Sequence, residues 1–143
     1  MPDNRNEILG TSKWLKQVIE ADLKTAQGMI SGAYLDLIPA DKALPAVRYS
    51  VFGSRDVRGN ASVRILSNID WLVVVVREGL DVAPLVPIAD RLDTVLNEAS
   101  GEVADVWVGA CFRLEPFQIT ERSDSGVQYR HAGGIYRTMV QAK

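Results

Sequence analysis

The sequence contains few of the residues on which covalent cross-links and metal centres depend. Among its 143 residues there is one cysteine, Cys111, and one histidine, His131. A single cysteine cannot form an internal disulfide, which is consistent with a reducing compartment. A structural zinc site needs about four nitrogen, sulfur or oxygen ligands, usually from clustered cysteines and histidines. We therefore expect neither a disulfide framework nor a metal site.

The sequence also lacks an excess of one charge and a long apolar run. Its formal net charge is -2, so it has no basic surplus of the kind that binds nucleic acid tightly. The longest apolar run, residues 71–76, is too short to span a bilayer, and no secretory signal is expected at the N-terminus. What remains is the composition of an ordinary soluble globular protein, 47% hydrophobic and 24% charged.

Hydrophobic periodicity predicts two helices. Residues 1–10 are polar and are expected to form a flexible tail, and the first helix is expected to start at Thr11. Pro84 and Pro87 fit the first turn of the second helix, where missing N–H groups cost little, and Gly101 is available for a left-handed cap at its end. The apolar stripes of the two helices are Trp14, Leu15, Val18, Ile19, Leu23 and Ala26, then Leu85, Ile88, Ala89, Leu92, Val95 and Leu96.

Alternating segments predict the strands, and a short additional strand fits the connection 32–44. The polar segment 53–62 is interpreted as a turn or hairpin tip. Gly133 and Gly134 lie inside the last strand, where a bulge or bend is expected. The main strands are expected at 45–52, 63–78, 103–117 and 126–141.

The predicted order is helix, two or three strands, helix, two strands. This order favours one α+β domain over residues 1–143, with a mostly antiparallel sheet, long hairpins and two main helices packed on one face.

One resemblance favours an enzyme. The segment FGSRDVRGNASVRILSNIDWLVVV resembles the signature of minimal nucleotidyltransferases of the polymerase-beta superfamily. In that family a Gly-Ser turn holds the triphosphate, an Asp-x-Asp pair holds divalent metals, and a third carboxylate comes from a later strand. The corresponding residues are Gly53 with Ser54, Asn68 with Asp70, and Asp105. Asn68 departs from the pattern, because a neutral amide is a weaker ligand for magnesium than a carboxylate.

A second resemblance extends from about residue 11 to the end of the chain. The segments ADRLDTVLNEASG, SRDVRGNASVRIL and GACFRLEPFQITERSDSGVQYRHAGGIYRTMVQ resemble the tail-terminator and tail-completion proteins of tailed bacteriophages. This resemblance also accounts for both FGSRDVRGN and YRHAGGIYR, whereas the first accounts only for the former.

The second resemblance implies a structural virion protein rather than an enzyme. Such proteins form a ring, usually a hexamer, that caps the head-proximal end of the tail tube and joins it to the connector or stopper of the head. DNA passes through the lumen and is contacted only non-specifically. The implied partners are further copies of the chain, the tube protein and the connector or stopper protein, with no membrane, cofactor, metal or catalytic residue. The implied location is the virion tail or neck, assembled in the cytoplasm of the bacterial host.

Six charged residues are the candidates for the subunit interface or the lumen of such a ring. Arginine suits interfaces because its planar guanidinium pairs with carboxylates and is weakly hydrated. The alternatives left open are a nucleotidyltransferase, its inactive descendant, and a soluble adaptor domain without a phage connection. The six candidates are Arg55, Asp56, Arg58, Arg64, Arg130 and Arg137.

Overall fold

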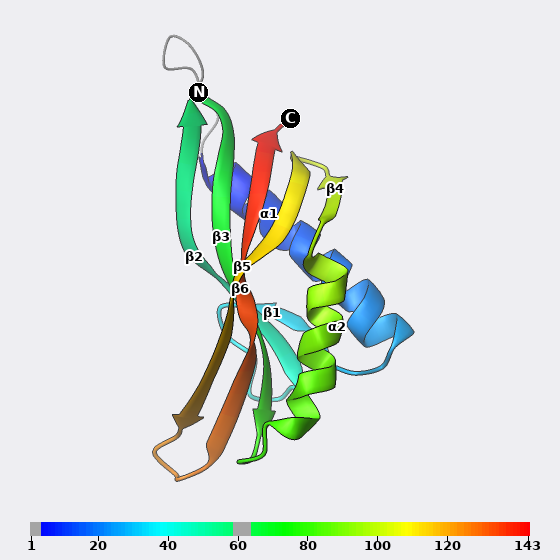
Figure 1. The fold of residues 1–143 in the computed structure, drawn as a ribbon, viewed down its shortest axis with the longest axis vertical. Helices are drawn as coiled ribbons and strands as arrows, with labels where there is room; N and C mark the ends of the chain where they lie inside the picture. Colours follow the sequence, from blue (N-terminus) through cyan, green and yellow to red (C-terminus); the bar gives the residue numbers. More distant parts are fainter. Residues whose placement is uncertain (1–3, 59–63) are drawn as a thin grey trace.

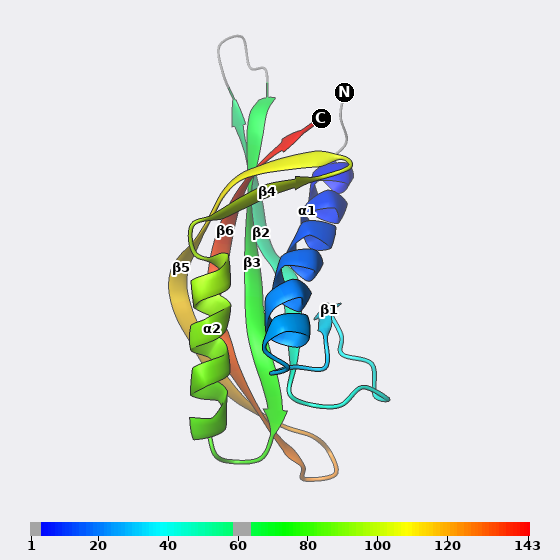
Figure 2. The same cartoon turned by 90° about the vertical axis from the view of Figure 1, so that its right-hand side faces the viewer.

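The computed structural model describes residues 4–58 and 64–143 and confirms the predicted α+β class. A six-stranded sheet has the order β1-β2-β3-β6-β5-β4 and carries both helices on one face (Figures 1 and 2). The β1–β2 pair is parallel and the other described pairs are antiparallel. The elements are α1 (Asn4–Ile19), η1 (Glu20–Ala26), β1 (Ala33–Leu35), β2 (Ala46–Arg58), β3 (Arg64–Glu78), η3 (Ala83–Leu85), α2 (Val86–Leu96), β4 (Ala99–Val103), β5 (Val106–Arg122) and β6 (Gln128–Ala142).

The helices pack on the sheet through the predicted stripes. Leu15 of α1 and Leu92 of α2 are fully buried against a sheet face whose centre is Trp71 of β3. Successive strand residues point to opposite faces, so Val73 and Val75 join Trp71 beneath the helices. Within the described residues, no helix is long and apolar enough to cross a membrane.

The first helix starts earlier than expected. Residues 4–10 belong to α1 and are not a flexible tail. Glu7 is 2% exposed and accepts a 2.6 Å hydrogen bond from the Ser67 hydroxyl of β3, while Gly10 lies against Val106 of β5. The polar sequence of residues 4–10 does not predict a buried helix, because the partner that satisfies the buried Glu7 lies 60 positions further along the chain.

The end of the second helix also differs from the expectation. Gly101 is not its cap: α2 ends at Leu96, and Glu98 takes the left-handed conformation, with φ 70°. Gly101 lies in β4, where a Cβ would come within 2.7 Å of the Trp14 indole nitrogen. Three strands rather than two therefore follow α2. The apolar residues of 103–117 conceal the tight β4–β5 turn at 104–105, because valines stand on both sides of it.

The hairpin of β2 and β3 is longer than expected, because β2 continues through most of the predicted turn. A bulge between Val51 and Gly53 takes up one residue, and pairing with β3 then resumes. Arg58 is the last described residue of β2 and pairs with Arg64. The rest of the predicted tip, 59–63, lies outside the described residues. Cross-strand pairing thus overrides the local turn preference of the glycine and the charges.

The glycine pair in β6 serves close approach rather than a bulge. The β3–β6 register runs through Gly133 and Gly134 without a shift, and the irregularity lies instead in β5, between Arg113 and Glu115. A Cβ at Gly133 would lie 2.0 Å from the Val73 carbonyl oxygen. Only glycine permits the two backbones to come this close.

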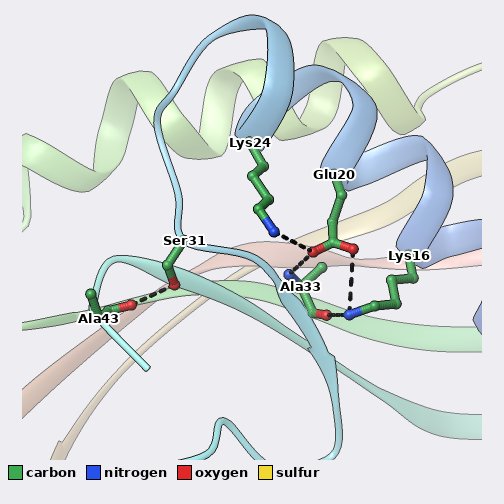
Figure 3. A network of polar contacts seen from close by, with 6 residues as sticks. All are labelled: Lys16, Glu20, Lys24, Ser31, Ala33 and Ala43. Carbon is green, nitrogen blue, oxygen red and sulfur yellow. Dashed lines mark hydrogen bonds and ion pairs between the residues drawn. The ribbon is translucent and has the colours of Figure 1, made fainter. Parts of the chain in front are cut away.

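The outer edge of β1 is closed by side chains of α1 and η1 (Figure 3). The Ala33 backbone N–H donates to Glu20, at 3.3 Å, and Lys16 donates to the Ala33 carbonyl oxygen, at 2.5 Å. Lys16 and Lys24 also lie 3.4 and 3.8 Å from the Glu20 carboxylate. These contacts satisfy the outward-facing backbone groups of an edge strand, which prevents another strand from adding there.

Candidate assembly surface

Most of the predicted interface residues lie on the β2–β3 hairpin. Arg55 and Arg58 are exposed on β2, near the end of the hairpin. Asp56 is half-buried, and its carboxylate lies 2.8 Å from the Ser67 hydroxyl oxygen, the same hydroxyl that contacts Glu7. Arg64 is placed only by its backbone, opposite Arg58. The hairpin therefore carries four of the six candidates at one end of the molecule (Figure 1).

The other two candidates are bound within the subunit. The Arg137 guanidinium donates to both oxygens of Asp70, at 2.8 and 3.1 Å, and this bond raises the pKa of Arg137 above its ordinary value. Arg130 donates to the Leu80 carbonyl oxygen, at 2.9 Å, and also to the Thr120 hydroxyl. The six residues consequently do not form one cluster, since Arg130 lies at the end of the sheet away from the β2–β3 hairpin (Figure 1).

The structure brings together most of the residues that resemble a nucleotidyltransferase site. Gly53, Ser54, Asn68 and Asp70 line a hollow of about 250 Å³, together with Arg55 and Arg137. The Asp70 carboxylate is already paired with the Arg137 guanidinium. The positively charged guanidinium therefore occupies the carboxylate oxygens that a magnesium ion would need.

The third carboxylate of that pattern lies elsewhere. Asp105 is exposed in the β4–β5 turn, beside the end of β6, whereas Asp70 pairs with the middle of β6. In the part of the chain that the structure describes, no group of three His, Cys, Asp or Glu side chains could hold a metal ion. These residues do not fit a two-metal centre, which needs several carboxylates around both ions.

Cys111 and His131 do not form a nucleophile pair. Cys111 is fully buried in the core beneath the helices, where burial raises the pKa of its thiol to about 12. His131 lines a cavity on the opposite face of the sheet. The Cys111 thiol therefore stays protonated near neutral pH and is a packed core side chain.

Two stretches of strand have an open outer edge, a feature that sequence periodicity could not locate. β1 pairs with β2 only at Val47–Tyr49, and β4 pairs with β5 only as far as Cys111. Among the described residues, no strand pairs with the outer side of β2 at 50–58 or of β5 at 114–122. We call these stretches the open β2 edge and the open β5 edge.

Exposed apolar side chains accompany both open edges. Phe52 on β2 is 63% exposed, and Leu114 and Ile119 on β5 are 43% and 40% exposed. The open β2 edge lies near the top of Figure 1 and the open β5 edge near the bottom, and the strand order puts them toward opposite edges of the twisted sheet. Unpaired backbone groups flanked by apolar side chains are the features by which strands recruit further strands.

Comparison with known proteins gives a likeness of fold. No family model matches the chain, and no curated protein matches it. Among solved structures, it is similar to a chain from the "Virion of native gene transfer agent (GTA) particle", with a TM-score of 0.59 and 14% sequence identity. The match covers 90% of this chain and 92% of that chain, so the two share a fold over nearly their whole lengths.

Proposed function

We propose that this protein is a structural protein of a phage-like virion and acts as a tail terminator. The observation that carries the proposal is the fold shared with a virion chain over 90% of the present chain. The resemblance of its sequence to tail-terminator and tail-completion proteins supports the finer assignment. In this role, copies of the chain form a ring, usually a hexamer in the resembling proteins, on the head-proximal end of the tail tube. The ring stops growth of the tube and binds the connector or stopper of the head.

The open β2 and β5 edges supply the contact between subunits in this ring. Three antiparallel steps, β2–β3, β3–β6 and β6–β5, separate the two edge strands, so β2 and β5 run in opposite directions. A rotation about an axis that is roughly parallel to the strands, which are tilted to it, preserves those directions between neighbours. It therefore brings the open β5 edge of one subunit antiparallel to the open β2 edge of the next. Such a contact joins two different surfaces, as a closed ring requires.

The stagger of the two open edges is compatible with closure. They lie toward opposite ends of the molecule, so direct pairing shifts one subunit along its neighbour (Figure 1). Strands that are tilted to the ring axis accommodate a shift of this kind, as the strands of closed barrels do. Lys16 and Glu20 bind the backbone of Ala33 and so close the β1 edge. The strand of the neighbouring subunit is thereby restricted to the open β2 edge.

The hairpins and the net charge suit the remaining contacts of a terminator. The β2–β3 and β5–β6 hairpins project from opposite ends of the molecule and can meet the tube on one side and the connector on the other (Figure 1). In the ring, Arg55 and Arg58 near the end of the β2–β3 hairpin contact carboxylates of a neighbouring subunit. A subunit with a net charge of -2 limits non-specific attraction to DNA that passes through the lumen.

The ring is tested by light scattering after size-exclusion chromatography and by negative-stain microscopy, in the presence and absence of tail tubes. Closed rings on tube ends, or in solution, are expected. A protein that stays monomeric and leaves tube length uncontrolled contradicts the proposal.

The edge contact is tested with a proline on the outer side of β5. The Cys111 carbonyl accepts from the Glu98 N–H and the Arg113 N–H donates to Asn97, so the backbone groups of both residues point away from β6. The bulge between Arg113 and Glu115 then changes which residues of β5 point their backbone groups outward, from odd-numbered to even-numbered positions. Pro116, Gln118 and Thr120 consequently face the open edge, in agreement with the missing N–H of Pro116. Gln118→Pro removes one outward N–H while leaving the β5–β6 ladder intact.

Gln118→Pro is expected to fold with an unchanged circular dichroism spectrum but to assemble poorly, whereas Gln118→Ala, which keeps the N–H, assembles like the wild type. A Gln118→Pro protein that forms normal rings contradicts the edge contact and leaves the terminator function standing. A double Arg55→Ala, Arg58→Ala variant is expected to fold normally but to assemble less well or to give tails of irregular length.

A further inference from the structure

A cavity of about 400 Å³ lies beneath the loop that joins β1 to β2, on the sheet face away from the helices. Val75 and Ala132 pack in the core under the helices, so their strand neighbours Val76 and His131 point to the other face and line this cavity. The loop contributes Leu37, Ile38 and Leu44 as an apolar wall. The volume is in the range of small-molecule sites, which begins at roughly 300 Å³.

Polar atoms without hydrogen-bond partners line the inner side of this cavity. In the part of the chain that the structure describes, the Arg48 Nε and both ring nitrogens of His131 are buried and have no hydrogen-bond partner. His131 is only 4% exposed. Its Nε2 lies 3.1 Å from a carboxylate oxygen of Glu121, but the pair is not aligned as a hydrogen bond. Buried polar atoms left in this state destabilise a protein unless something binds them.

The charges around His131 favour an additional anion. Burial lowers the pKa of His131 below its ordinary value, and the positive charge of Arg48 lowers it further, while Glu121 opposes both effects. Lys42 and Tyr129 also line the cavity. Arg48 and Lys42 carry two positive charges against the single negative charge of Glu121, so one further negative charge balances the site.

We propose that this cavity binds a carboxylate carried on an apolar chain. The Arg48 guanidinium and the His131 imidazole donate to the carboxylate, and Leu37, Ile38 and Leu44 contact the apolar part. A monoanion suits the site better than a phosphate dianion, because Glu121 repels the second charge. The inference does not depend on the ring, because the two proposed donors, Arg48 and His131, lie outside both open edges; of the lining residues, only Glu121 belongs to the open β5 edge.

The cavity continues into a second hollow, so the carboxylate has two possible sources. The second hollow, of about 430 Å³, shares Lys42, Leu44 and Tyr129 with the first and extends to Arg77 and Glu78. A short organic acid fills the first hollow alone. A polypeptide that ends in apolar residues and a free C-terminal carboxylate occupies both.

The test uses His131 as its probe, because it is the only histidine and its imidazole NMR signals need no assignment. Addition of hexanoate is expected to shift these signals and to raise the titration midpoint of His131 by about one pH unit, because an opposite charge beside an imidazole favours its protonated form. Hexanol, which lacks the carboxylate, is expected to leave the midpoint unchanged. Equal effects of hexanoate and hexanol, or no effect of either, overturn the proposal without recourse to any variant.

Variants locate the binding site. Arg48→Gln is expected to weaken hexanoate binding about tenfold, the loss that accompanies removal of one charged hydrogen bond. Arg55→Gln removes the same charge on the distant hairpin and is the matched control, with binding unchanged. Equal weakening by both variants overturns the site.

A peptide series distinguishes the two sources. The probe is Ala-Leu-Leu with a free C-terminus, compared with its C-terminal amide and with hexanoate. Binding of the free acid at least about tenfold tighter than hexanoate, with loss in the amide, supports a protein C-terminus as the natural ligand. Equal affinities of the free acid and hexanoate support a small organic acid. Binding of the amide as tight as that of the free acid overturns the carboxylate requirement.

Discussion

Gly133→Ala places one methyl group at the closest approach between two strands. The new Cβ would lie 2.0 Å from the Val73 carbonyl oxygen and 2.8 Å from the Val74 Cα, whereas ordinary contacts fall at 3.4–4 Å. Both obstacles are backbone atoms of β3, so no change of side-chain rotamer removes the overlap. The strands have to separate, and β6 loses part of its ladder with β3.

The expected cost follows from these two effects. Overpacking costs about 1–3 kcal/mol, and each backbone hydrogen bond weakened by the separation adds about 1 kcal/mol. We therefore expect Gly133→Ala to lower the free energy of unfolding by about 3–5 kcal/mol, a large part of the roughly 5–15 kcal/mol typical of a folded domain. Urea unfolding followed by tryptophan fluorescence measures the change, because Trp71 is fully buried beside this contact.

Gly53→Ala is the matched control. Gly53 also lies in a strand, but a Cβ there meets no described atom within 4 Å. Its substitution is expected to change stability by less than about 1 kcal/mol in either direction. Both variants are measured at one protein concentration, since assembly adds to apparent stability. A loss below about 1 kcal/mol for Gly133→Ala would refute the claim that close backbone approach requires glycine.

Three further predictions concern the core and the candidate metal residues. Leu92 is fully buried in the middle of α2, so Leu92→Ala is expected to lower the free energy of unfolding by about 2–5 kcal/mol in the same urea assay, and a loss below about 1 kcal/mol would mean that α2 is not packed as described. Burial raises the pKa of the Cys111 thiol to about 12, so at pH 8 this thiol is expected to react with a disulfide reagent only after the protein unfolds. Rapid labelling of the native protein would contradict this burial. Magnesium with a nucleoside triphosphate is expected to give no heat of binding in calorimetry, because Asn68 replaces a carboxylate and the Arg137 guanidinium is bound to both oxygens of Asp70. Micromolar binding that depends on Ser54 and Asp70 would favour the enzyme instead.

The candidate site was only partly predictable from the sequence. The position of Arg55 and Arg58 on one hairpin could be predicted, because the two residues are close together in the sequence. The pairing of Arg137 with Asp70 does not, because those residues are 67 positions apart and meet only through the β3–β6 register. The open edges have no sequence signal either, since an edge is defined by where a neighbouring strand stops.

The sequence by itself determined the two helices, the main strands and the faces they bury. Periodicities of 3.6 and 2 residues act within single elements, so the stripe of Leu92 and the alternation around Trp71 specify which side of each element is apolar. The net charge and the single cysteine likewise needed no structure.

Only the tertiary structure decided the features that depend on distant partners. Glu7 becomes part of a buried helix because Ser67 of β3 donates to it, and local polarity alone predicts a tail. Gly133 is required by a carbonyl oxygen on another strand, and its sequence context suggests only a bend. Arg48 and His131 line one cavity because strand order and register bring β2 and β6 to either side of β3. Such non-local contacts are set by the packing of the whole sheet, whose register no single segment encodes.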